Sequence, residues 1–291
     1  MSTRIALATC EALPDLDPDD QPLVEHFHEA GIEAIPAVWS DRGIEWSEFD
    51  FVILRNTWDY TSRLEEFLDW AQARGDSLRN SYDVVQWNSN KIYLRDLASS
   101  GFPIVDTQFV TGESNNWEVP SDSDFVVKPT VSAGSQDTMR YSGTDPVSIK
   151  SAQDLLDRIV SQGKTAMVQP YLATVDEIGE TAQLYIGGEY SHSIRKGPLL
   201  VRDSESEKEL GLFLKEDITV RVPNAQQREL ADRLMAYVTA RFGTPLYARV
   251  DLLDDMDGTP VILELELVEP SMFFATAPDS ALRMVNKLNR M

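Results

Sequence analysis

Short apolar runs alternate with helical patterns along the first 85 residues of the chain. Apolar runs that end at turn residues are typical of buried strands, and apolar residues three or four positions apart indicate one face of a helix. This alternation predicts a parallel sheet that packs against helices. The expected strands are Arg4–Thr9, Ala34–Trp39 and Phe51–Arg55, and the expected helices are Pro22–Ala30 and Leu64–Arg74. Pro36 has no N–H to donate, so the second strand should lie at an edge of the sheet.

The rest of the chain predicts further strands and helices. Gly187-Gly188 separates two strand patterns and indicates a hairpin, whose far end carries Arg195 and Lys196. The polar stretch Val201–Lys215 predicts a solvated surface loop or a mobile loop over a site. The expected helices are Asn88–Ser100, with Lys91 in its first turn, Ala152–Gln162 and Gln226–Phe242. The expected strands are Phe125–Lys128, Thr165–Gln169, Thr181–Ile186, Tyr190–Ile194, Leu246–Leu253 and Pro260–Val268.

The last two strands alternate charged and apolar residues around a turn. Asp257-Gly258 is a favoured two-residue hairpin turn, so Met256 should pair with Thr259. This register places Asp251 opposite Glu264 and Arg249 opposite Glu266, and side-chain alternation puts all four groups on one face. The other face, toward a core, should carry Val250, Leu252, Leu263 and Leu265.

Carboxylates that face each other across a sheet repel, and a single arginine does not balance three of them. A divalent cation supplies the missing charge, and Mg²⁺ typically takes one or two carboxylates together with substrate phosphates. The pattern therefore favours a Mg²⁺ site at Asp251, Glu264 and Glu266. A solvent-exposed polar strand face, where water screens the repulsion, is the alternative, and a shifted register would remove the site.

Two loops that follow apolar strands are candidate ligand sites. Lys128 ends one strand and precedes the small polar residues 130–138, whose backbone N–H groups can approach an anion. This loop matches neither common phosphate-binding fingerprint, and a plain hairpin turn would have the same composition. The segment Arg55–Tyr60 leaves the C-terminal end of another strand, where open α/β sheets bind ligands. A loop with aromatic anchors would look the same.

Composition and charge exclude some classes of partner. The 291 residues are 42% hydrophobic and 25% charged, as in ordinary globular proteins, and carry a net charge of −22. That charge argues against nucleic-acid binding and against an anionic membrane surface. The single cysteine, Cys10, allows no intrachain disulfide and suits a reducing compartment. No apolar run approaches the roughly 18 residues of a membrane span, and no signal peptide is recognisable, so we expect a cytoplasmic protein.

The order and spacing of several short motifs resemble the ATP-grasp enzymes over roughly residues 86–275. The motifs are WNSNK (87–91), FVVKPTVSAGSQDT (125–138), VQPYL (168–172), GETAQLYIGG (179–188), SIRKGP (193–198), ARVDLL (248–253) and ILELE (262–266). Within that superfamily, RNTWDY (55–60), KPTVSAGSQDT (128–138) and LELELVEP (263–270) are most similar to the ligase that closes O-ureido-serine into cycloserine.

This resemblance implies an α/β fold in which an N-terminal Rossmann-like domain, residues 1–85, precedes two ATP-grasp subdomains, 86–168 and 169–291. It also implies ATP and Mg²⁺ as cofactors. The residues implied to bind ATP are Lys91, Lys128, Ser132, Gly134, Ser135, Gln169, Tyr171, Leu172, Glu180 and Lys196, with Asp176 as a competitor of Glu180 for the ribose. Arg195, with Lys128, would stabilise the transferring phosphate, and Asp251, Glu264 and Glu266 would bind Mg²⁺.

Three positions depart from the pattern of many relatives. Pro170 replaces a glutamate, Thr181-Ala182 replaces an arginine, and Glu266 replaces an asparagine. Adenine recognition, substrate anchoring and the charge of the metal site should therefore differ from those relatives.

The chemistry implied by the resemblance is phosphorylation of a carboxylate and attack by a nitrogen. An amino-acid-like substrate suits Arg55 or Arg249 as a bidentate clamp for its carboxylate. The other expected substrate contacts are Thr57, Asp59 and Ser271. We expect a ring-forming ligase that converts an O-ureido-D-serine-like substrate to D-cycloserine. The alternatives are a two-substrate amino-acid or peptide ligase and a non-catalytic ATP-binding module. A homodimer is also expected.

Overall fold

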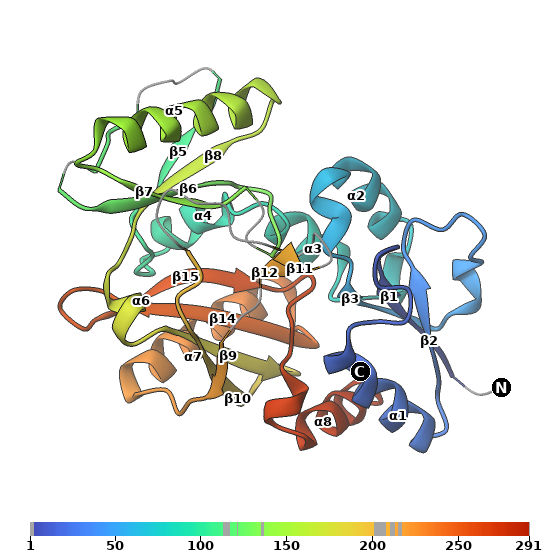
Figure 1. Ribbon diagram of the computed structural model, residues 1–291. Helices are drawn as coiled ribbons and strands as arrows, with labels where there is room; N and C mark the ends of the chain where they lie inside the picture. Colours follow the sequence, from blue (N-terminus) through green and yellow to red (C-terminus); the bar gives the residue numbers. More distant parts are fainter. Residues whose placement is uncertain are drawn as a thin grey trace.

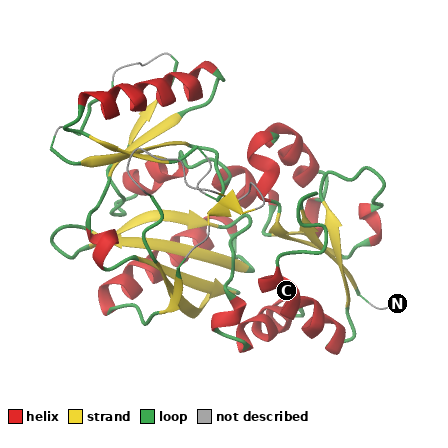
Figure 2. Ribbon diagram, in the orientation of Figure 1, coloured by secondary structure: helices red, strands yellow, loops and turns green. Residues whose placement is uncertain are grey.

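The chain folds around three main sheets. The computed structural model describes residues 3–112, 117–120, 122–134, 137–200, 208–209, 213–214 and 217–290. The N-terminal sheet lies on the right in Figure 1, and the other two lie one above the other on the left. Figure 2 shows that helices cover the outer faces of these sheets. The expected α/β class is confirmed.

The N-terminal sheet is parallel and has the strand order β2-β1-β3-β4. Its edge strand β2 contains Pro36, as the sequence predicts. The strands are β1 (Arg4–Thr9), β2 (Glu33–Val38), β3 (Phe51–Asn56) and β4 (Leu78–Arg79), and the helices are α1 (Gln21–Glu29) and α2 (Leu64–Gln72). Short 3₁₀ helices are η1 (Pro18–Asp20), η2 (Trp46–Glu48), η3 (Trp58–Ser62) and η4 (Gly75–Ser77).

The upper sheet in Figure 1 is antiparallel, has the order β5-β8-β6-β7 and packs against one long helix, α5. Buried apolar residues of α5, such as Leu155 and Ile159, contact Phe125 and Val127 of β6. The bounds are β5 (Gln108–Val110), β6 (Asp124–Pro129), β7 (Met139–Ser142), β8 (Ala166–Pro170) and α5 (Pro146–Ser161).

The lower sheet is also antiparallel, with the order β13-β10-β9-β14-β15. The expected hairpin at Gly187-Gly188 joins β9 to β10. The strands are β9 (Glu180–Ile186), β10 (Glu189–Lys196), β13 (Ile218–Val220), β14 (Tyr247–Asp254) and β15 (Pro260–Glu266). The helices are α6 (Thr174–Glu177) and α7 (Ala225–Phe242), and β11 (Lys208–Glu209) pairs with β12 (Phe213–Leu214). The rest of the predicted loop Val201–Lys215 lies outside the described residues.

Helix α7 begins at a reciprocal cap. The Asn224 side chain accepts a hydrogen bond from the Gln227 backbone N–H at 2.8 Å, and the Gln227 side chain accepts one from the Asn224 N–H at 3.1 Å. Two of the backbone donors that a helix start leaves unpaired are thereby satisfied. Gly243, with a φ of 86°, ends the helix, as the sequence predicts.

The single helix expected at Asn88–Ser100 is wrong. Two helices, α3 (Tyr82–Asn88) and α4 (Tyr93–Ser99), replace it, and Lys91 lies between them. The Asn90 side chain accepts a hydrogen bond from the Ile92 N–H, and the Lys91 N–H donates to the Thr130 carbonyl. Both bonds compete with helical bonding, because they satisfy backbone groups locally or through another segment.

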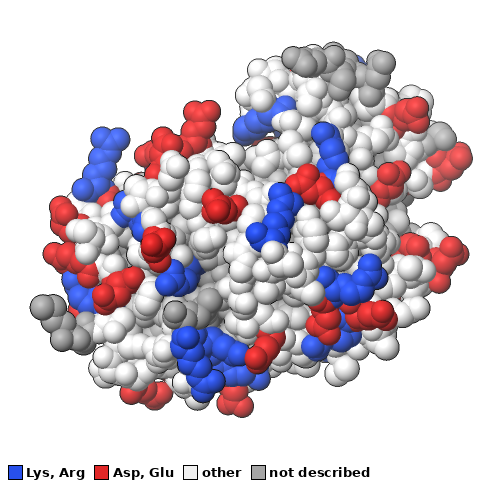
Figure 3. Space-filling view, turned by 180° about the vertical axis from the view of Figure 1, so that it is seen from behind, with Lys and Arg blue, Asp and Glu red and all other residues white. Residues whose placement is uncertain are grey.

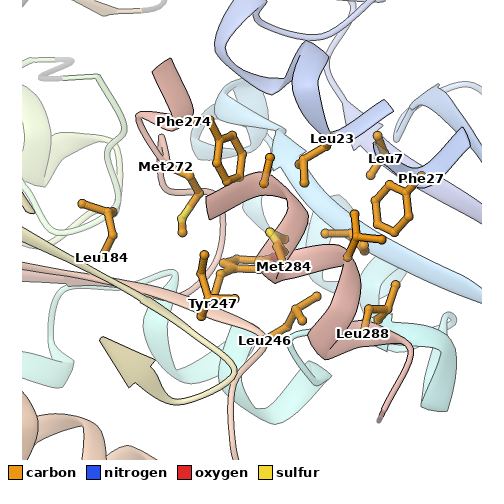
Figure 4. Close-up of a cluster of buried hydrophobic side chains, with 14 of the residues drawn as sticks. Leu7, Leu23, Phe27, Leu184, Leu246, Tyr247, Met272, Phe274, Met284 and Leu288 are labelled. Carbon is orange, nitrogen blue, oxygen red and sulfur yellow. The ribbon is translucent and has the colours of Figure 1, made fainter. Parts of the chain in front are cut away.

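The C-terminal helix packs against the N-terminal unit. Helix α8 (Asp279–Leu288) follows the short helix η5 (Phe274–Thr276) and contacts α1. Figure 4 shows Met284 and Leu288 beside Leu23 and Phe27 in one buried cluster. Leu184 of β9 belongs to the same cluster, so this core joins the N-terminal sheet to the lower sheet. The predicted domain boundaries remain predictions, but the last residues share a core with the first.

His192 of β10 gives the fold a pH dependence. Its Nε2–H donates to the Met272 carbonyl at 2.9 Å, and burial lowers the pKa of His192 to about 4. An unfolded histidine has a pKa near 6.5, so the unfolded chain binds more protons between pH 6.5 and 4. Stability should therefore fall with acidification in that window, by up to about 1.4 kcal/mol per pH unit from this group. Urea unfolding of the wild type and of His192→Gln between pH 7 and 4.5 checks this. If the free energy of unfolding depends on pH equally in both proteins, His192 is not the source of the pH dependence.

Basic as well as acidic side chains reach the surface, although the net charge is −22. On the face drawn in Figure 3, basic side chains alternate with acidic ones. Among the described residues, no helix is both long enough and apolar enough to span a membrane.

Candidate active site

The hairpin of β14 and β15 carries the candidate metal residues in the expected register. Asp251 pairs with Glu264, and Arg249 pairs with Glu266. The turn itself differs from the prediction. The Gly258 N–H donates to the Asp255 carbonyl, so the turn has one residue more than the expected Asp257-Gly258 turn.

A bulge in β15 compensates for the longer turn. Leu252 pairs with Ile262, whereas Asp251 pairs with Glu264, so Leu263 is the extra residue. A bulge changes which face the neighbouring side chains occupy. Ile262 therefore enters the core, and Leu263 lines a cavity. The prediction that Leu263 faces the core is wrong for this reason, whereas Val250, Leu252 and Leu265 are core residues as expected.

A cavity of about 480 Å³ lies where the three sheets meet. That volume lies in the range of small-ligand sites. The N-terminal unit contributes Asp17, Asp19, Trp58 and Tyr60 to its wall. The upper sheet and the following loop contribute Val126, Lys128, Ser132 and Gly134, and the β14–β15 hairpin contributes Arg249, Asp251, Glu264 and Glu266.

Buried ion pairs neutralise the acidic residues of the hairpin. Asp251 accepts from Arg249 at 2.9 Å and from Lys196 at 2.8 Å, and Glu266 also pairs with Arg249. Glu264 pairs with Lys91 at 2.9 Å. The positive charge that the sequence requires is thus partly supplied by side chains from three different segments.

The shifted pKa values follow from burial and from these pairs. Burial raises the pKa of Asp251, but the charges of Arg249 and Lys196 outweigh that effect and lower it. The pKa of Glu264 is likewise lowered, because Lys91 and Lys128 outweigh burial. Burial raises the pKa of Glu266 to about 7. Burial and the ion pairs therefore favour the ionised form of Asp251 and Glu264, whereas Glu266 is partly protonated near neutral pH.

The oxygen donors of the hairpin suit a hard cation, but their arrangement in this structure does not form a metal site. Among the described residues, no three histidine, cysteine, aspartate or glutamate side chains converge as a metal site. Asp251, Glu264 and Glu266 instead point their oxygens at cationic side chains. Oxygen-only donors suit Mg²⁺, which completes its shell with phosphate oxygens and water. These residues fit the ion only when a phosphate ligand supplies the remaining donors.

Comparison with known proteins identifies the family. Residues 5–80 match the family model of the N-terminal domain of D-cycloserine synthetase DcsG. The chain is 33% identical to the cycloserine biosynthesis protein DcsG of Streptomyces lavendulae over 309 aligned positions, which cover 98% of this chain and 97% of that protein. The chain belongs to the D-cycloserine synthetase family. The resemblance found in the sequence is confirmed.

Solved structures agree with this assignment. The crystal structure of D-cycloserine synthetase DcsG superposes with a TM-score of 0.87 at 32% identity and covers 99% of each chain. The ATP-grasp ligase PsnB, solved with Mg and ADP, superposes with a TM-score of 0.62 at 15% identity and covers 100% of this chain and 99% of that one. The ATP-grasp fold is confirmed, and this D-cycloserine synthetase homologue is an ATP-dependent ligase.

In this D-cycloserine synthetase homologue, the expected phosphate-binding residues lie together at one wall of the cavity. Lys128 and Ser132 are buried there, and Gly134, with a φ of 57°, adopts a left-handed conformation that favours glycine. The Lys91 ammonium donates to the Ser132 carbonyl at 2.7 Å, which ties it to the loop. Burial lowers the pKa of Lys128. Ser135 lies outside the described residues.

The expected nucleotide-base and ribose residues line the cavity beside these lysines. Gln169, Tyr171 and Leu172 all contribute to the wall, as does Glu180. Burial raises the pKa of Glu180 to about 8 despite its ion pair with Lys196. Asp176 does not line the cavity, because its carboxylate accepts from the Tyr171 hydroxyl and pairs with Arg140. The geometry therefore favours Glu180 over Asp176.

Strand alternation separates the two basic residues of β10. Strand β10 extends through Lys196, so Arg195 and Lys196 point to opposite faces. Lys196 is buried in the cavity wall, whereas Arg195 donates to the Ile178 carbonyl and pairs with Asp217. The prediction that Arg195 contacts the transferring phosphate does not fit this geometry, because Lys196 and not Arg195 lines the cavity.

The substrate residues expected in the N-terminal unit do not reach the cavity. Arg55 is fully buried and pairs with Asp20 at 2.9 Å, which corrects its expected role as a carboxylate clamp. Thr57 is buried elsewhere, and Asp59 accepts from Trp39 and Arg63 instead. The structure brings Trp58 and Tyr60 of the same segment to the cavity. Arg249 and Ser271 line the cavity, and their role as substrate contacts stays a prediction.

Sequence reasoning missed several residues of this wall, including Trp58, Tyr60, Leu263, Phe273 and Glu269. Glu269 is the clearest omission. LELELVEP contains three glutamates, and only the first two fit the alternation of charged and apolar residues along the strand. The third follows the end of β15, and a charged residue directly before Pro270 is a signal that could have found it.

Proposed function

We propose that this chain uses ATP to close an O-ureido-D-serine-like amino acid into the ring of D-cycloserine through an acyl phosphate. The observation that carries the proposal is that one cavity is lined by Lys91, Lys128 and Lys196 and also by Arg249 and Ser271. A nucleotide and a small carboxylate can meet there. The cycloserine activity is that of the DcsG relative, which this chain matches along nearly its whole length.

The lysines of the cavity would hold the nucleotide phosphates. Lys91 and Lys128 lie beside the small-residue loop, and Lys196 approaches from the opposite sheet. Phosphoryl transfer needs charge neutralisation and alignment more than covalent help from the protein. Glu180 would accept hydrogen bonds from the ribose, and Lys196 would stabilise the transferring phosphate.

Asp251, Glu264 and Glu266 would hold Mg²⁺ when nucleotide phosphates complete its coordination. The ion supplies charge neutralisation for the phosphates. Lys91 and Lys196 now pair with Glu264 and Asp251, and they would turn toward phosphate oxygens instead.

Ring closure forms a bond between the nitrogen attached to oxygen and the carboxyl carbon of the same molecule. The acyl–oxygen bond breaks, and phosphate leaves with the electron pair. Because both reacting groups belong to one molecule, orientation in the cavity replaces a bimolecular encounter. Cycloserine lacks the carbamoyl group of O-ureido-serine, so water must also cleave the bond between that group and the ring nitrogen. The nitrogen keeps a proton, and the carbamoyl group leaves as carbamic acid, which decomposes to carbon dioxide and ammonia.

The remaining parts of the proposal concern organisation and location. We retain the division at residues 85 and 168, a homodimer and a cytoplasmic location. The support for the location is that the single cysteine, Cys10, is buried and free.

ADP release tests the proposed reaction. With ATP and Mg²⁺, O-ureido-D-serine alone should give ADP, and mass spectrometry should detect cycloserine. The L-isomer and D- or L-alanine should give little ADP. Turnover only with pairs of amino acids would overturn ring closure in favour of a two-substrate ligase. ATP binding without turnover on any member of this panel would leave a binding module.

A further inference from the structure

Glu269 is a buried carboxylate in the cavity wall that the proposed reaction does not yet use. The residue is 9% exposed, and no hydrogen-bond partner for its Oε2 atom lies in the described part of the chain. Glu180 also has an oxygen without a hydrogen bond, Oε1, but that atom forms an ion pair with Lys196. Asp251, Glu264 and Glu266 form ion pairs, and Asp19 accepts from two backbone N–H groups.

The surrounding residues hold Glu269 in place without neutralising it. The Tyr60 hydroxyl forms a side-chain hydrogen bond with its carboxylate, and the Trp58 indole donates to its carbonyl at 3.0 Å. The next carbonyl, of Pro270, accepts from Arg55 at 3.0 Å. Glu269 is thus fixed by the RNTWDY segment, whose aromatic residues reach the cavity while its arginine supports the backbone.

A buried carboxylate oxygen without a hydrogen-bond partner destabilises the fold, so we expect a ligand group to donate a hydrogen bond to it. The ligand must offer N–H or O–H donors, and a cation would stabilise the site most. Arg249 lies beside the same segment, because its guanidinium donates to the Ser271 carbonyl and lies over the Phe273 ring. Arg249 and Glu269 thus both contribute to the cavity wall near the segment after β15. Burial raises the pKa of the Glu269 carboxyl to about 8, so a cationic ligand group would hold it in the ionised form.

We propose that Glu269 binds the protonated amino group of the amino-acid substrate, while Arg249 faces the carboxylate. This inference rests on the proposed function and narrows its substrate class to α-amino acids with a free amine. Glu269 is then a specificity residue that touches the substrate, and Tyr60 positions it. ATP binding does not depend on either residue.

A double comparison of enzyme and substrate tests the inference. The wild type and Glu269→Gln are assayed by ADP release with O-ureido-D-serine and with an analogue that has hydrogen in place of the amino group. For the wild type, loss of the amine should lower kcat/KM roughly 10- to 100-fold, which corresponds to one charge-assisted hydrogen bond. Glu269→Gln should lose about the same factor with the amine present and almost nothing with the analogue.

A structural role would give a different result. If Glu269 only supports the fold, the variant should lose activity equally with both substrates, and this outcome would overturn the inference. Tyr60→Phe, which keeps the aromatic ring, should raise the KM of the amino substrate several-fold. Neither variant should change the KM of ATP. Glu229→Gln, on the exposed face of α7, is the matched control and should behave as the wild type.

Calorimetry separates failure of the inference from failure of the proposed function. If wild-type protein neither binds nor turns over O-ureido-D-serine or any other amino acid of the panel, the proposed function fails, and the inference fails with it. If the wild type is active and Glu269→Gln binds the amino substrate with unchanged affinity, only the inference fails. Thermal unfolding with and without ATP verifies that each variant retains the fold.

Discussion

Replacing Glu264 with glutamine is expected to lower kcat roughly 100- to 1,000-fold, the range found when one preorganised charged or polar contact to a transition state is removed. Glu264 pairs with Lys91 and, in the proposed reaction, binds Mg²⁺ together with Asp251. Glutamine keeps the size of the side chain but removes its charge. Lys91 would then be a buried cation without its partner, and the ion would lose a ligand.

A magnesium titration identifies the cause of this loss. ADP release is measured at rising Mg²⁺ concentration for the wild type and for Glu264→Gln. If Glu264 is a metal ligand, the variant should reach half of its maximal rate only at a Mg²⁺ concentration at least roughly 10-fold higher than the wild type needs. Glu229→Gln, exposed on α7, should match the wild type in both respects. Full activity of Glu264→Gln at the wild-type Mg²⁺ concentration would remove Glu264 from the metal site.

The sequence is most informative where one strand pattern determines a whole face. Alternation in β14 and β15 places Asp251 opposite Glu264, and the structure confirms this pairing. The reason given for it was partly wrong, because the turn is longer than expected and a bulge at Leu263 restores the register. Bulges carry no clear sequence signal, so the error at Leu263 could not be avoided by pattern alone.

Residues at the ends of elements were predicted less well. Arg195 and Lys196 are adjacent in sequence. Strand β10 runs two residues further at its C-terminal end than expected, and its alternation places only Lys196 in the cavity wall. The end of a strand is the least certain part of a pattern. The sequence thus identifies the basic pair but not the member that reaches the site.

Contacts between segments far apart in the sequence could not be predicted from the pattern of apolar and polar residues. Arg55 lies at the end of a buried strand, and a substrate carboxylate is the partner expected from the sequence. In the structure Asp20, 35 residues earlier, neutralises it, and no periodicity links the two positions. The unpaired oxygen of Glu269 could not be predicted either, because it depends on the contact between the RNTWDY segment and the residues after β15.

Breaking the Arg55–Asp20 pair should destabilise the protein more than any surface change. Both side chains are almost fully buried, and Asn56 also donates to Asp20 at 2.9 Å. Burial lowers the pKa of Arg55, but the charge of Asp20 outweighs that effect and raises it. Asp20→Ala leaves the guanidinium buried and uncompensated, which typically costs about 3–5 kcal/mol. For a chain of this length, the melting temperature should fall by roughly 5–10 °C.

A double replacement distinguishes a structural pair from a substrate clamp. Replacing the pair with Asp20→Val and Arg55→Met removes both charges at similar total volume, and such changes often restore most of the stability. The double variant should therefore melt well above Asp20→Ala and keep the wild-type KM for the amino-acid substrate. Asp154→Ala, which breaks the exposed Lys150–Asp154 pair, is the control and should leave the melting temperature almost unchanged. A double variant that folds as the wild type but has a KM at least 10-fold higher would return Arg55 to the substrate site. Because Arg55 supports the backbone beside Glu269, a shift of only a few-fold would instead reflect that support.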